Sequence, residues 1–188
     1  MEKGKTGLLV IIVLITIQWA VPVHSKKAYL SGIVVTNLRD NLLVYFSVKD
    51  WFTVEMNRAI ESGLNTTFTF FIRLYKKKSF WWDQKITALE IKHSIKYDNL
   101  KKIYEVRLSE RGDKTITVRD FDEAKKLMSD VVALKVTPLN TLLQDGRYKL
   151  QMMAELDKIK LPFYLHYVFF FLSLWDFETD WHTIDFRY

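Results

Sequence analysis

The sequence predicts a mainly β protein: an antiparallel β-sandwich (immunoglobulin-like or similar) with two short helices, preceded by an N-terminal signal helix. Short runs of β-branched and aromatic residues recur along the chain and are separated by turn residues. Two other segments show helical spacing behind a capping residue. Aromatic residues make up 15% of the 188 residues, which supplies a core and excludes a disordered chain.

The N-terminus has the three parts of a secretion signal. Lys3 and Lys5 make it positive, residues 8–17 are apolar apart from Thr16, and Val23 and Ser25 fit the −3 and −1 positions of a cleavage site. This apolar segment is shorter than the ~20 residues of a membrane-spanning helix, so an uncleaved anchor is the alternative. We expect residues 1–25 to direct export and residues 26–188 to form a single β-rich domain.

Strands are expected wherever apolar residues alternate or run together between turns. Residues 86–97 alternate most clearly, with Leu89, Ile91 and His93 on one face, so His93 is expected in the core. Asp145-Gly146 is a strong hairpin-turn signal before the strand at residues 147–156. The other expected strands are residues 29–36, 42–49, 66–75, 102–109, 115–118, 133–137 and 181–186.

Two segments carry helix signals. Thr53 can cap a helix over residues 54–62, and Gly63 follows where a left-handed residue is needed. Asp120 opens the second helix, with Glu123 three residues later as a capping box. Its expected apolar stripe consists of Phe121, Ala124, Leu127, Met128, Val131 and Val132.

Charge and residue types limit the function classes. The net charge is +6, and removing Glu2, Lys3 and Lys5 with the signal leaves 26 basic and 21 acidic residues, a surplus that suits an anionic membrane or an acidic partner. The basic residues are dispersed and not interleaved with aromatics, so no nucleic-acid partner is expected. The sequence contains no cysteine and no recognisable nucleophile–base arrangement, so we expect neither an enzyme nor a cofactor.

An acidic run near the C-terminus is a candidate metal site. If it forms a strand, Asp176, Glu178, Asp180 and His182 share one face, and such ligands could hold a divalent cation. Adjacent carboxylates on one strand lie about 7 Å apart, however, which is too far to share a small ion without a turn. A solvated face opposite an inward-packed Phe177 and Trp181 is therefore the favoured interpretation.

The aromatic residues are the candidate contacts for a ligand or partner. Trp81 and Trp82 are consecutive, so on an extended chain they face opposite ways and at least one is exposed or covered only by a loop. Trp175 and Trp181 are further candidates, since exposed tryptophans stack on sugars or lie at membrane interfaces. The most apolar stretch, residues 161–175, is expected to be a buried strand, with a surface resting on a membrane as the alternative.

Several segments resemble an uncharacterised bacterial domain-of-unknown-function family of exported envelope proteins (DUF4390-like). They are residues 43–48 (LVYFSV), 52–56 (FTVEM), 60–63 (IESG), 67–70 (TFTF), 74–75 (LY), 95–98 (IKYD) and 175–181 (WDFETDW). The resemblance implies a bacterial cell envelope, in the periplasm or at the outer face of the inner membrane. It also hints, through the family's gene neighbourhood, at a membrane sensor kinase as partner, and it assigns no catalytic residue.

The expected function is therefore that of a non-enzymatic binding or interaction module at the periplasmic membrane face. Its partner would be an envelope protein or the membrane surface. The alternative is a β-sandwich that binds a hydrophobic or carbohydrate ligand through exposed aromatics. A metal-dependent enzyme is less well supported, because the acidic run has no recognised ligand spacing.

Overall fold

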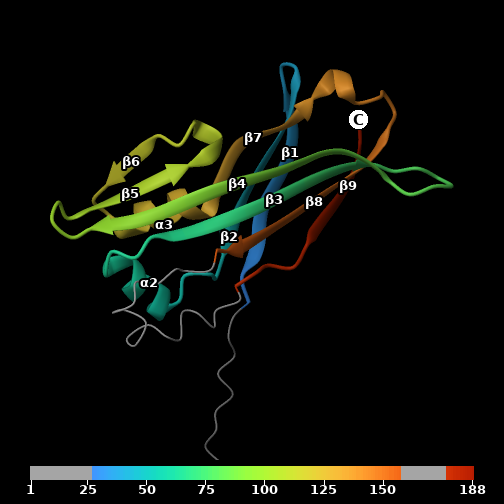
Figure 1. Ribbon diagram of the computed structural model, residues 1–188. Coiled ribbons are helices and arrows are strands. Elements are labelled where there is room, and N and C mark those ends of the chain that lie inside the picture. The colour runs from blue at the N-terminus through green and yellow to red at the C-terminus, as the bar shows by residue number, and fades with distance from the viewer. Residues whose placement is uncertain (1–26, 158–176) are drawn as a thin grey trace, which may run out of the picture.

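The computed structural model describes residues 27–157 and 177–188, which form two antiparallel sheets and two α-helices (Figure 1). The mainly β, sandwich-like prediction with two short helices is confirmed. The predicted signal and the apolar stretch at residues 161–175 lie outside the described residues. No helix among the described residues is long and apolar enough to cross a membrane.

The strands are divided unequally between the two sheets. The three-stranded sheet has the order β1-β2-β7, and the six-stranded sheet has the order β6-β5-β4-β3-β8-β9. Figure 1 shows the strands of the small sheet crossing those of the large one. The bounds are β1 Tyr29–Leu38, β2 Asn41–Lys49, β3 Thr66–Lys76, β4 Gln84–Asp98, β5 Ile103–Leu108, β6 Thr115–Val118, β7 Asp130–Pro138, β8 Arg147–Leu156 and β9 His182–Arg187.

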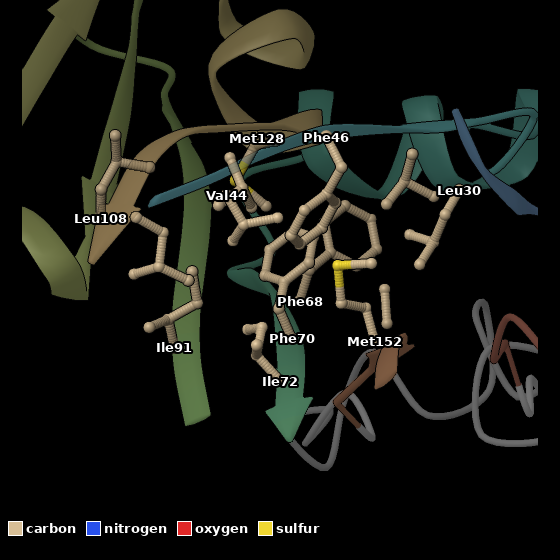
Figure 2. Close-up of a cluster of buried hydrophobic side chains, with 14 of the residues drawn as sticks. Leu30, Val44, Phe46, Phe68, Phe70, Ile72, Ile91, Leu108, Met128 and Met152 are labelled. Atoms are coloured by element: carbon tan, nitrogen blue, oxygen red, sulfur yellow. The ribbon is translucent and has the colours of Figure 1, made fainter. Parts of the chain in front are cut away.

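The core lies between the two sheets. Alternation along β3 and β8 turns every second side chain inward, so Phe70, Ile72 and Met152 are fully buried. Val44 and Phe46 of β2 meet them from the small sheet (Figure 2), and the rings of Phe46 and Phe70 make an edge contact at 5.8 Å. Burial of these side chains is the main source of stability in a chain without disulfides.

Both helices begin at the predicted caps. Helix α2 (Val54–Glu61) starts after Thr53, whose hydroxyl accepts a hydrogen bond from the Met56 N–H, and Gly63 follows its end with a φ of +89°. Helix α3 (Phe121–Ser129) starts after Asp120, whose carboxylate accepts from the Glu123 N–H. Its ring at Phe121 stacks on Tyr104 of β5, so α3 covers part of the large sheet.

Two details of the prediction are wrong. Val131 and Val132 do not extend the apolar stripe of α3, because the helix ends at Ser129 and both valines begin β7. β-branched residues favour the extended backbone over a further helical turn. The Asp145-Gly146 turn does not close a hairpin either, since β7 pairs with β2 and β8 pairs with β3 and β9.

The prediction for His93 is confirmed: its side chain is fully buried. Nδ1 lies 3.0 Å from the carbonyl oxygen of Met128, which can only accept, so this nitrogen carries a proton. Nε2 lies 3.1 Å from a carboxylate oxygen of Glu110. His93 thus connects β4 to the end of α3 and to the short 3-10 helix η2 (Ser109–Arg111), which is a structural role.

Candidate interaction surface at the hairpin tip

The most exposed aromatic cluster lies in the turn between β3 and β4, residues 77–83, which we call the hairpin tip. Phe80, Trp81 and Trp82 are 93%, 79% and 92% exposed. Burying a Phe or Trp removes about 150–250 Å² from water, so leaving three of them exposed forgoes a large gain in stability. Contiguous exposed apolar surface of this kind marks a contact with another molecule.

The strands below hold the hairpin tip away from the rest of the surface. β3 and β4 are the longest strands, with 11 and 15 residues, and they pair from Thr66↔Ile95 to Lys76↔Gln84. In Figure 1 their hairpin extends beyond the ends of the neighbouring strands. The tip therefore presents its aromatic side chains without steric interference from the sheets.

Two further interactions fix the base of the hairpin tip. The Lys77 N–H donates to the carbonyl of Arg147 at 2.8 Å, which joins the end of β3 to the start of β8. The Lys149 ammonium donates to the carboxylate of Asp83, and this hydrogen bond is the main cause that lowers the pKa of Asp83. Asp83 therefore stays ionised at neutral pH, and the turn keeps a fixed exit into β4.

Basic side chains surround the base of the hairpin tip. They come from three separate parts of the sequence, because β8 lies beside β3 and β9 lies beside β8. Lys77 pairs with Asp185 at 2.9 Å, and Lys149 pairs with Asp83. We call the other five residues the basic ring. Their charged groups have no carboxylate within 4 Å in the described part of the chain: Lys76, Lys78, Lys85, Arg147 and Arg187.

The other predicted contact residues do not join this cluster. Trp181 precedes β9 and is 37% exposed, with the guanidinium of Arg73 at 4.3 Å from its ring centre. It therefore lies on the outer face of the large sheet. The prediction that Trp181 packs inward is wrong. Trp175 lies outside the described residues. Of the four tryptophans named from the sequence, Trp81 and Trp82 alone form a shared exposed cluster within the described residues.

The acidic run does not have the predicted strand geometry. Glu178 makes an isolated bridge to Glu155, and β9 begins only at His182. Asp180 pairs with Lys27 at 2.6 Å, and Asp176 lies outside the described residues. Across residues 27–157 and 177–188, no group of three or more His, Asp or Glu side chains is arranged to hold a metal ion.

Sequence reasoning found the aromatic half of the candidate surface but missed most of the charged half. Lys76, Lys77 and Lys78 are visible in the sequence as a charge cluster, but such a run by itself indicates only the solvated end of a strand. Arg147 and Arg187 are about 70 and 110 positions away from that cluster along the chain. Only the pairing register of β3, β8 and β9 brings them to the same end of the sheet.

Comparison with family models matches residues 25–185 to a domain of unknown function (DUF4390). No curated protein and no solved structure matches the chain. The match covers both helices, the hairpin tip and all strands except the last two residues of β9.

Proposed function

Because this chain belongs to the DUF4390 family, a domain of unknown function, we propose a function from its own surface. The protein is a non-enzymatic interaction module at the periplasmic face of a membrane, and it attaches to the bilayer through the hairpin tip. One observation carries the proposal: Phe80, Trp81 and Trp82 are exposed together at the end of a projecting hairpin. Tryptophan favours the membrane–water interface, because its ring is amphipathic and lies at the level of the headgroups.

The energy available from the tip is sufficient for reversible attachment. At the observed exposures the three side chains offer on the order of 500 Å² of surface. Placing half of that surface in the interface gives about 6 kcal/mol at ~25 cal/mol per Å². This free energy lies in the range of a peripheral membrane contact and is far below that of a membrane-spanning helix.

A protein partner or a small ligand would use the same aromatics in a different way. A protein interface surrounds its aromatic anchors with well-packed neighbours, and a sugar or apolar ligand is bound in a concave site. The hairpin tip projects beyond the sheets (Figure 1), and the hollow beside α3 at Trp51, Phe52 and Lys125 lies in another part of the surface. A bilayer accepts a projecting apolar tip without a matching cavity.

The test is tryptophan fluorescence of the full chain with phospholipid vesicles. The spectrum of a Trp81→Phe/Trp82→Phe variant is subtracted from that of the wild type, which isolates the tip from the other four tryptophans. We expect the difference spectrum to be that of exposed indole in buffer and to shift to shorter wavelength when vesicles are added. A difference spectrum that vesicles leave unchanged refutes the proposal.

A second pair of variants measures how much the tip contributes to affinity. Phe80→Ser/Trp81→Ser/Trp82→Ser should lower the affinity for vesicles by at least 100-fold. This figure refers to the part of the affinity that does not come from the N-terminal segment. Leu100→Ser is the matched control, because Leu100 is 95% exposed in the turn at the other end of β4. Equal losses of vesicle affinity in both variants would show that any exposed apolar residue binds the vesicles nonspecifically. Crosslinking of the tip to one envelope protein would instead show that its partner is a protein and not the membrane.

A further inference from the structure

We infer that the membrane surface this protein recognises is anionic, and that the basic ring around the hairpin tip binds lipid headgroups that carry a negative charge. This inference rests on the proposed function, because it names the chemistry of the surface into which the tip inserts. It adds a second set of residues, the charged ring, whose contribution can be measured separately from that of the aromatics.

The main observation is a like-charge pair. Arg147 of β8 and Arg187 of β9 are directly opposite each other in the pairing register, and both side chains are exposed. Opposite positions on antiparallel strands place their Cβ atoms about 4.5–5.5 Å apart, and like charges there destabilise the sheet. Neither guanidinium has a carboxylate within 4 Å in the described residues. An anion between the two would convert this repulsion into a bidentate contact.

The surroundings of the pair keep the field positive. The aspartates nearest to the tip are already engaged, Asp83 with Lys149 and Asp185 with Lys77. Asp145, two residues before Arg147 in the turn that leads into β8, is a further acidic residue that adjoins this end of the sheet. It is outnumbered by Lys76, Lys78 and Lys85, so the ring has a surplus of positive charge beside the aromatic tip.

Aromatic and basic side chains here act at neighbouring depths. The tip aromatics enter the interface while the ring stays at headgroup level, because all of its residues except Lys78 lie on the strands directly below the tip. Each Lys or Arg at an anionic surface strengthens binding by about five-fold, and salt screens this gain within about 10 Å at 0.1 M. The structure thus combines the two signals that reversible membrane attachment requires.

The test compares the full chain on two kinds of vesicle, one of phosphatidylcholine alone and one with about a third phosphatidylglycerol. We expect tighter binding to the anionic vesicles, and a loss of that preference in high salt. Arg147→Gln/Arg187→Gln should lower affinity for the anionic vesicles by about 25-fold and leave binding to phosphatidylcholine nearly unchanged. The matched control is Lys114→Gln/Arg119→Gln, which removes the same charge from exposed residues flanking β6, on the far side of the large sheet.

The outcomes separate the two proposals. Equal binding of the wild type to both vesicles, with the tip fluorescence shifted in each, overturns the anionic preference and leaves the tip proposal standing. Equal losses in the test and control variants show an effect of net charge alone and overturn the role of the ring. No fluorescence shift on either vesicle overturns the proposed function and this inference with it. Thermal unfolding of the arginine variant controls for folding, and we expect it to be no less stable than the wild type.

Discussion

Trp51 connects the loop after β2 to helix α3, and its hydrogen bond is open to a quantitative test. The side chain is 2% exposed and its ring stacks on Phe68, with ring centres 3.4 Å apart. Its indole N–H donates to the hydroxyl oxygen of Ser129 at 3.1 Å, and that hydroxyl in turn donates to the carbonyl of Lys125 at 2.9 Å. The indole thus helps to fix the position at which α3 ends and β7 begins.

The magnitudes follow from what each variant leaves unpaired. Ser129→Ala leaves a buried indole N–H without an acceptor, which costs about 1–3 kcal/mol. Trp51→Phe loses the hydrogen bond and part of the stacked area, so we expect a cost of about 2–3 kcal/mol. In the Trp51→Phe background Ser129→Ala should cost close to nothing, because its partner is already gone and alanine favours a helix. The coupling free energy should therefore equal the cost of Ser129→Ala alone, about 1–3 kcal/mol.

The assay is urea unfolding of the four chains in the double-mutant cycle, followed by circular dichroism. An m-value common to all four shows that the variants unfold from the same fold. If Ser129→Ala costs the same with and without the indole, the hydrogen bond contributes nothing and the account given for Trp51 is wrong.

Three further predictions concern single sites. Burial first, and then the neighbouring carboxylates of Asp157, Glu178 and Glu90, raise the pKa of Glu155 above 4.5. The fold therefore disfavours the charged form of Glu155, which lowers the free energy of unfolding. This loss is absent below the pKa of the unfolded state and grows as pH rises through the pKa of the folded state. Glu155→Gln should therefore stabilise at pH 7 and not at pH 4 in urea titrations, and an equal effect at both would contradict this. Ala133 has a φ of +54° in β7, so Ala133→Gly should raise stability by about 0.5–1 kcal/mol, whereas Ala154→Gly in β8 should lower it. Replacing Phe80, Trp81 and Trp82 by serine should change the free energy of unfolding by less than about 0.5 kcal/mol, and a larger loss by calorimetry would show that the tip packs on the fold.

The elements themselves could be predicted because their signals are local. The alternation in β4 and the capping residues Thr53 and Asp120 are contained within a few positions, and each identifies its element without knowledge of the rest. The assignment of strands to the two sheets, in contrast, depends on residues far apart in the sequence. The Asp145-Gly146 turn suits a hairpin, yet β7 pairs with β2, which is far away in the sequence. Local turn chemistry carries no information about that choice.

The candidate surface likewise has one part that local sequence predicts and another that depends on long-range strand pairing. That Trp81 or Trp82 would be exposed follows from two consecutive large side chains pointing to opposite sides of a strand. That Arg147 and Arg187 lie beside them depends on the register of three strands, and so do the ion pairs of Lys77 and Lys149. The left-handed backbone of Ala133 could not be anticipated either, since alanine disfavours it and only the bulge between β2 and β7 imposes it.

The order of strands in the small sheet has a consequence for folding during synthesis. β1 and β2 are made first, but β7, which completes their sheet, begins only after residues 50–129 have been synthesised. At ~5–20 residues per second this interval lasts about 4–16 s. Throughout it the edge of β2 that later pairs with β7 has no strand beside it. The nascent chain therefore carries an aggregation-prone edge for seconds, which a holding chaperone would have to shield until the last strands arrive.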